Sequence, residues 1–288
     1  MATEGAASEL IASAERKAAM AHARFGYETD RAERHELLAD QARTQALREM
    51  HLRIARMHRS TAACHQTAAR LQEDYVTRLT GWTPRRGGPM PVFMSGVAAA
   101  CGTDSAAVAL IGASHDQLAL AASDEPSRAA QELEFLLGEG PARDATNEAR
   151  PVLADGSDLF DRWPGYGPAV AELGIKAVAA VPLGLSGTCV GALAVFDPAQ
   201  GVADAGPFGE VAEALTRSMI LGPDGDPGLY GATDVRAEVH QAAGMVSVHL
   251  GCPVTDALQL IKAHAFAEGS SAHSVAERVL SGELRLGR

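Results

Sequence analysis

Residues 233–288 of this chain read TDVRAEVHQAAGMVSVHLGCPVTDALQLIKAHAFAEGSSAHSVAERVLSGELRLGR. Apolar residues recur here at alternating steps of three and four, which is the spacing of one helix face. Gly251 and Pro253 end the first segment and Gly269 ends the second, because these residues stop helices. The N-cap candidates are Thr233, Thr255 and Ser270 or Ser271. The expected inward residues are Val235, Val239, Ala242, Val246 and Leu250, then Ala257, Leu260, Ile261, His264 and Ala265, then Ala272, Val275, Ala276 and Val279. The stretch therefore predicts three short helices that pack through small side chains.

The same stretch carries a family resemblance. It rests on His240–Met245 (HQAAGM), Leu250, Ala257–Leu258, Leu260, Ala263–Phe266 (AHAF) and Val275–Val279 (VAERV). This pattern covers nearly all of residues 234–281 and resembles the ANTAR family of bacterial three-helix domains. The resemblance implies RNA binding. The helix pattern alone favours a packing or dimerisation element, because small residues at helical spacing are what close helix contact requires.

The candidates for RNA contact lie off the inward faces. Gln259, Lys262 and Phe266 are spaced by three and four, so they share a stripe on the second helix. A cation and an aromatic ring on one stripe suit a phosphate and an unstacked base. A second set, at the start and outer face of the third helix, is His273, Ser274 and Arg278. General burial statistics favour a core role for Phe266 and a solvated charge for Lys262, so these alternatives stand beside the RNA assignment.

Charge is uneven along the chain, whose formal net charge is −11. Residues 82–230 hold 8 basic and 19 acidic side chains, whereas residues 1–81 hold 12 and 11. Residues 231–288 hold five basic and six acidic side chains, which is a weak electrostatic basis for binding nucleic acid. We therefore expect RNA binding to need two linked copies of this tail and to be sensitive to salt.

The first 81 residues are predicted to be helical. Between Arg31 and Leu79 there is neither proline nor glycine, and helix-forming residues dominate. A seven-residue pattern, which we call the heptad seam, comprises Leu47, Met50, Ile54, Met57, Thr61, Cys64, Ala68, Leu71 and Tyr75. The seam predicts a coiled coil that dimerises the chain. Gly26 is the expected break, so residues 1 to about 30 form a separate helix or stay mobile.

A linker rich in glycine and proline occupies residues 81–89. After it, in residues 90–221, short apolar runs replace the long helical pattern. Strands are predicted at residues 106–111, 117–121, 151–154, 177–183 and 189–196, with helices at 127–136, 143–149, 166–173 and 208–220. Gly184–Gly187 joins two strands as a hairpin, so the architecture is α+β with antiparallel pairing. This order of elements resembles a GAF domain, and so do the segments Leu137–Pro141, Arg143–Asp144, Arg150–Val152, Val181–Leu183 and Val190–Leu193. The resemblance implies a small-molecule pocket or a dimerisation role.

Two features of this region each allow two interpretations. Phe160, Trp163 and Tyr166 lie in a segment rich in proline and glycine, where they form a ligand lid or, more commonly, a satellite core. Gly138–Pro141 leads into a helix and forms either an anion cradle or a tight turn. Glu139 at its centre favours the turn.

The residues that catalysis would need are not brought together by the sequence. Cys64, Cys101, Cys189 and Cys252 have no paired spacing, and the ten histidines are scattered. There is no phosphate-binding glycine loop followed by lysine and no nucleophile elbow. We therefore expect no enzyme activity, metal or cofactor. The lack of a long apolar run or an export signal predicts a cytoplasmic protein with reduced thiols and no membrane partner.

The combined prediction is a multidomain protein. It has an all-α coiled coil at residues 1–81, an α+β GAF-like sensor with an antiparallel sheet at residues 90–221, and an all-α three-helix ANTAR domain at residues 229–288. The expected function is a dimeric transcription antitermination regulator, which binds paired stem-loops in nascent mRNA under the control of an unidentified small-molecule ligand. The alternative is a protein-interaction or dimerisation regulator whose ANTAR-like tail does not bind RNA.

Overall fold

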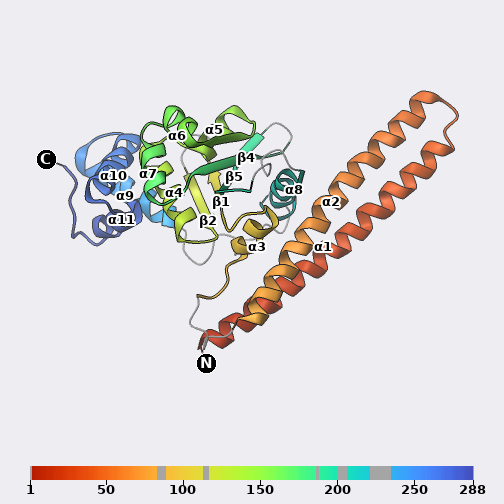
Figure 1. The fold of residues 1–288 in the computed structure, drawn as a ribbon, viewed down its shortest axis with the longest axis horizontal. Helices are drawn as coiled ribbons and strands as arrows, with labels where there is room; N and C mark the ends of the chain where they lie inside the picture. The colour runs from red at the N-terminus through yellow and green to blue at the C-terminus, as the bar shows by residue number, and fades with distance from the viewer. Residues whose placement is uncertain are drawn as a thin grey trace. The chain divides into compact units, whose positions relative to one another are not determined.

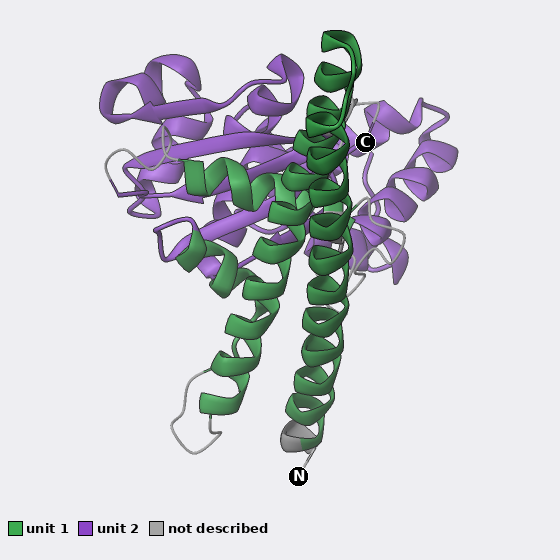
Figure 2. Cartoon of the chain, turned by 90° about the vertical axis from the view of Figure 1, so that its right-hand side faces the viewer, with its two compact units in different colours: residues 1–100, 206–226 green, residues 101–205, 227–288 purple. Residues whose placement is uncertain are grey.

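The computed structural model of the chain describes residues 2–82, 89–112, 117–185, 188–199, 206–220 and 235–287. Most of the first predicted linker (residues 83–88), the glycine- and proline-rich residues 222–228 and the predicted cap Thr233 lie outside the described residues. The chain divides into two compact units, residues 1–100 with 206–226 and residues 101–205 with 227–288 (Figure 2). None of the described helices combines the length and the apolar character that crossing a membrane requires.

The first unit is built on a helical hairpin. α1 (Ala2–Asp40) and α2 (Gln45–Gly81) lie side by side and run in opposite directions (Figure 1). The chain turns at residues 41–44, where the Thr44 side chain accepts a hydrogen bond from the Leu47 amide (3.3 Å) and caps α2. The helices approach through buried alanines, which include Ala14, Ala18, Ala32, Ala39, Ala55, Ala62 and Ala69. α3 (Phe93–Ala100), α8 (Gly206–Ala214) and the π-helix η2 (Leu215–Ile220) also pack on α2.

The predicted helix break at Gly26 is wrong. α1 continues through Gly26 to Asp40, and the chain reverses only after that residue. A glycine inside a helix costs only about 1 kcal/mol relative to alanine. The long contact between α1 and α2 offsets this cost.

The heptad seam is divided between buried and exposed residues. Cys64 and Leu71 are buried, whereas Leu47, Met50 and Met57 are 39–56% exposed. Within the chain α2 packs against α1. The surface of α2 that contacts α1 is a stripe of buried alanines next to the heptad seam. An intramolecular hairpin therefore accounts for the helical pairing, and the first half of the seam has no covering helix among the described residues.

The second unit contains a five-stranded sheet in the order β2-β1-β5-β4-β3, in which every pairing is antiparallel. The strands are β1 (Ser105–Ile111), β2 (Gln117–Ala122), β3 (Val152–Asp155), β4 (Ala177–Leu185) and β5 (Thr188–Phe196). β4 and β5 form the predicted hairpin, and residues 186 and 187 of its turn lie outside the described residues. The predicted α+β architecture with antiparallel pairing is confirmed.

Four helices pack on one face of this sheet and enclose its core (Figure 1). They are α4 (Glu125–Leu137), α5 (Pro141–Glu148), α6 (Gly156–Arg162) and α7 (Tyr166–Glu172). Trp163 and Tyr166 are 2% and 0% exposed within this core, whereas Phe160 is 44% exposed on α6. Trp163 and Tyr166 therefore belong to the main core, Phe160 lies outside it, and the three rings do not form a lid.

The segment Gly138–Pro141 is a structural turn. Gly138 has a φ of 72° and ends α4, as a left-handed C-terminal glycine does. The Glu139 carboxylate accepts hydrogen bonds from the amides of Gly165 (2.6 Å) and Tyr166 (2.8 Å). At the start of α5, where an anion would have to bind, the Glu134 carboxylate already accepts a hydrogen bond from the Arg143 amide (2.6 Å), so the turn interpretation holds.

Candidate functional site

Three helices lie at the C-terminal end of the second unit: α9 (Val235–Leu250), α10 (Val254–Glu268) and α11 (Ala272–Leu280). Gly251 and Gly269 adopt left-handed conformations, with φ of 63° and 62°, and end α9 and α10. The Ser271 side chain accepts a hydrogen bond from the Ser274 amide (3.1 Å) and caps α11. The predicted Thr255 cap is wrong, because α10 begins before that residue. The predicted three-helix arrangement is present.

Small side chains form the core of these helices. The buried residues include Val239, Ala242, Ala243, Val246, Ala257, Leu258, Ile261, Ala265, Ala272, Val275, Ala276 and Val279. Two predicted inward residues are misplaced: Leu260 is 43% exposed and Leu250 is 38% exposed, whereas Leu258 is buried. For α10 the reason is that this helix packs on α4 as well as on α9, so its buried arc turns toward residues 258 and 262.

An aromatic ring from α4 completes this core. Phe135 is 3% exposed and packs among the apolar residues of the three helices. The guanidinium carbon of Arg236 and Nζ of Lys262 each lie 3.9 Å from the centroid of its ring. Both cations are almost fully buried, at 0% and 3% exposure. A desolvated cation on an aromatic face contributes about 2 kcal/mol. We call Phe135, Arg236 and Lys262 the α4 clamp.

Polar contacts extend the α4 clamp to the third helix. Glu132 of α4 forms an ion pair with Arg236 (2.8 Å) and accepts a hydrogen bond from the Ala272 amide (2.8 Å) at the start of α11. Gln117 of β2 accepts a hydrogen bond from Nε of Arg236 (2.8 Å). α4 therefore contacts α9, α10 and α11 through charged or hydrogen-bonded groups as well as through the Phe135 ring.

A buried polar chain continues from Gln117 toward the core of the sheet. Gln117 donates to Gln131 (3.2 Å), Gln131 donates to Glu134 (2.9 Å), and Glu134 also accepts from the Arg143 amide (2.6 Å). Burial raises the pKa of Glu134 to about 7, against the lowering effect of these hydrogen bonds. Burial, and then the charge of Glu134, also raise the pKa of Tyr166. A cavity of about 20 Å³ beside Gln117 and Glu134 has room for about one water molecule.

Four of the six predicted RNA contacts, Gln259, Lys262, Phe266 and Arg278, occupy different environments. Gln259 and Phe266 are exposed on α10, Phe266 to 54%. Lys262 lies between them in the sequence but turns into the α4 clamp, so the predicted stripe is not a continuous exposed surface. Arg278 forms an ion pair with Glu268 (2.6 Å), and this hydrogen bond raises the Arg278 pKa. Local periodicity placed Lys262 on an outer face because it carried no information about the ring from α4.

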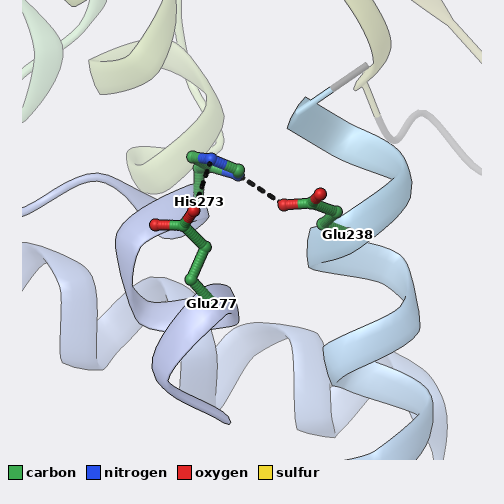
Figure 3. A group of neighbouring side chains, drawn as sticks. All are labelled: Glu238, His273 and Glu277. Carbon is green, nitrogen blue, oxygen red and sulfur yellow. Dashed lines mark ion pairs between the residues drawn. The ribbon is translucent and has the colours of Figure 1, made fainter. Parts of the chain in front are cut away.

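The other two predicted contacts lie in the first turn of α11. Nδ1 of His273 is 3.1 Å from Oε2 of Glu238, and its Nε2 is 3.5 Å from Oε1 of Glu277 (Figure 3). The Ser274 amide is already used in the helix cap. His273 is therefore flanked by two carboxylates, which compete with phosphate for its ring.

A groove of about 730 Å³ brings two of the six residues together. It runs between α4, α7 and the turn from α10 to α11, and both Phe266 and His273 line it. Its apolar lining includes Leu133 and Leu173, and its charged lining consists of Glu125, Arg128, Glu132 and Glu172. A molecule bound here would touch the helices that cover the sheet and the C-terminal helices at once.

The antiparallel sheet, its helical cover and the order of these elements agree with a comparison against known families. Residues 91–220 form a GAF domain. GAF domains are sensor domains that bind small molecules. The match begins before α3 and ends with η2, so the GAF domain takes elements from both compact units. No curated protein and no solved structure shows a significant match to the chain. The ANTAR resemblance of residues 234–281 stays a prediction.

Sequence reasoning missed Phe135, Glu132 and Arg236. Arg236 did carry a signal, because it shares a helix face with Val239 and Ala243, and a charge on an apolar face indicates a buried pair. Phe135 carried none, since an aromatic residue in a helix of an α+β domain is expected in that domain's own core.

Proposed function

We propose that this chain is a regulator of transcription antitermination that acts in the cytoplasm and binds RNA through its C-terminal helices under the control of its GAF domain. The support is the ANTAR resemblance of residues 234–281, the three helices that span it, and the GAF domain at residues 91–220. The proposal that the GAF domain controls RNA binding rests on the α4 clamp. A GAF helix buries Lys262, the cation of the predicted RNA stripe.

In this proposal the clamped state is the one with low RNA affinity. It buries Arg236 and Lys262, which are two of the five basic side chains of residues 231–288. Each phosphate contact on single-stranded nucleic acid adds about 0.7 to the slope of affinity against salt. Separation of α10 from α4 would uncover Lys262 and raise the affinity. A ligand of the GAF domain opens the clamp only to the extent that it binds the open state more tightly.

The proposed active form is a dimer. Two linked copies on a pair of stem-loops gain effective concentration that one weakly charged copy lacks. Leu47, Met50 and Met57 of the heptad seam are half-exposed and in register for a partner helix. We propose this part of the seam as the surface where a second copy packs.

The test is a gel-shift series with two-hairpin and single-hairpin leader RNAs from the host of the protein, at several salt concentrations. Phe135→Leu removes the aromatic face of the clamp and should bind two-hairpin RNA about 30- to 140-fold more tightly than the wild type, in proportion to the opened population. Adding Lys262→Gln should abolish most of that gain. Phe160→Leu is the matched control, because Phe160 is an exposed residue of the same GAF domain.

The outcomes separate the two parts of the proposal. If neither the wild type nor Phe135→Leu binds any paired-hairpin RNA at low salt, RNA binding is refuted. If both bind equally well, RNA binding stands and control by the clamp is refuted.

A second candidate is a protein-interaction regulator whose tail does not bind RNA. It is favoured by the burial of Lys262 and by the excess of acidic over basic side chains in residues 231–288. Crosslinking in the host cell that recovers a protein partner and no RNA would favour this candidate. Neither candidate assigns a catalytic residue. Burial raises the pKa of Cys64 to about 11 and that of Cys101 to about 12, which opposes a nucleophilic role for these thiols.

A further inference from the structure

Glu238, His273 and Glu277 gather at the contact between α9 and α11 (Figure 3). One ligand atom from each lies within 4.8 Å of the other two. His273 and Glu277 are four residues apart on α11, so their side chains share one face of that helix. Glu238 projects toward them from α9. The arrangement joins two helices that are separate in the sequence.

The chemistry of this group favours a metal ion over a simple ion pair. Two carboxylates face one imidazole, Glu238 at Nδ1 and Glu277 at Nε2, and the imidazole supplies at most one positive charge. A single ion binds only one of these nitrogens, so one glutamate has to turn toward the nitrogen that the other faces. An imidazole nitrogen with carboxylate oxygens suits Zn²⁺, Ni²⁺ and Co²⁺, whereas Mg²⁺ and Ca²⁺ prefer oxygen ligands alone. We propose that Glu238, His273 and Glu277 form a binding site for a divalent transition-metal ion, with water completing its coordination.

The surrounding structure makes the site both accessible and well supported. The His273 and Glu238 side chains are 26% and 43% exposed, and that of Glu277 is 63% exposed, so an ion can reach the group from solvent, while Nδ1 of His273 is itself enclosed. The backbones are held by the buried contacts of Val239 on α9 and Ala276 on α11. Metal–ligand distances of about 2.0–2.2 Å require the donor atoms to move closer together. The flexible glutamate side chains can do this by rotamer changes while both helices stay in place.

A bound ion would have two consequences. It would link α9 to α11 and stabilise the three-helix unit, because binding to the folded state alone favours that state. It would also add two positive charges beside the predicted contacts Ser274 and Arg278 and convert the net charge of residues 231–288 from −1 to +1. The second consequence rests on the proposed RNA-binding function, whereas the metal site does not.

The test titrates the full-length, reduced protein with Zn²⁺ by calorimetry and with Co²⁺ by visible absorption. The wild type should bind one equivalent at this site, with Co²⁺ absorption bands that report nitrogen and oxygen ligands. His273→Gln and Glu238→Gln should each weaken binding by about tenfold or more. Glu283→Gln is the matched control, because it removes an exposed carboxylate elsewhere on the same tail and should bind like the wild type. Circular dichroism confirms that each variant is folded.

His51→Gln tests the main competing site, because Nδ1 of His51 lies 3.0 Å from Nδ1 of His35 on the helical hairpin. Binding that is lost in His51→Gln and kept in His273→Gln would overturn the proposal, as would the absence of saturable binding in the wild type. Metal binding at His273 together with a failure to bind any RNA would leave the site standing and refute the proposed function.

Discussion

Replacement of Phe135 by leucine should weaken the contact between the C-terminal helices and the GAF domain, so that these helices unfold locally more often while the native state stays folded. Leucine keeps most of the apolar volume but lacks the aromatic face on which Arg236 and Lys262 lie, each 3.9 Å from the ring centroid. Two desolvated cation–π contacts contribute up to about 4 kcal/mol together. Arg236 keeps Glu132 and Gln117 as partners, so we expect a loss of about 2–3 kcal/mol. This corresponds to an increase of about 30- to 140-fold in the population of the opened state, at about 1.4 kcal/mol per tenfold change.

Native-state hydrogen exchange measured by mass spectrometry is the assay. Protection of α9, α10 and α11 should fall by about that factor, while β1 and β5 should keep their protection. Phe160→Leu should leave all of these elements unchanged. A change of less than about twofold in the C-terminal helices would refute the reasoning. Equal loss throughout the sheet would show that Phe135 supports the GAF core instead.

Three further predictions concern the second unit and the buried thiols. The raised pKa of Glu134, about 7, means that the folded protein holds a proton which the unfolded chain releases above about pH 4.5. Stability should therefore fall as pH rises from about 4.5 to 7, by about 3 kcal/mol in all. Denaturant unfolding of Glu134→Gln should lack this slope, and an unchanged slope would contradict the assignment. A Cβ at Gly191 would overlap the Ala109 carbonyl, so Gly191→Ala should destabilise the protein by about 2 kcal/mol, seen as a lower Tm; an unaltered Tm would contradict the close strand approach. Cys64 and Cys101, with pKa values raised by burial, should react with a disulfide reagent near neutral pH only after unfolding; rapid labelling of the native protein would show that they are accessible.

Helices and strands that are set by residues within their own segment could be predicted from the sequence. The five strands of residues 105–196 and the helices α4, α5 and α7 follow from short apolar runs, the hairpin turn and the glycines that bound them, whereas α6 was not predicted. The ends of α10 and α11 follow from Gly269 and Ser271, whose backbone and side chain stop or cap a helix without help from distant residues. The pattern of α11 also predicted its buried face correctly, because Val275 and Val279 share one face of a short helix.

Predictions that depend on contacts with residues far away in the sequence were wrong or incomplete. Gly26 did not break α1, because contact with α2 along the hairpin outweighs the cost of one glycine. The heptad seam was recognised, but not that α1 would pair with the neighbouring alanine stripe. Lys262 was predicted on an outer stripe, and its burial depends on Phe135, which lies more than a hundred residues earlier in the chain.

Periodicity and capping residues were thus sufficient for the number, the order and most of the boundaries of the C-terminal helices, because each helix is set by hydrogen bonds within its own segment. Which faces of those helices are available to a partner was a property of the folded unit. α4 covers one face of α10, and Glu238 of α9 meets His273 and Glu277 of α11, through contacts between residues that no local spacing relates. Desolvation of Arg236 and Lys262 arises only when Phe135 enters the core, and this makes the contact with the GAF domain the feature on which control would depend.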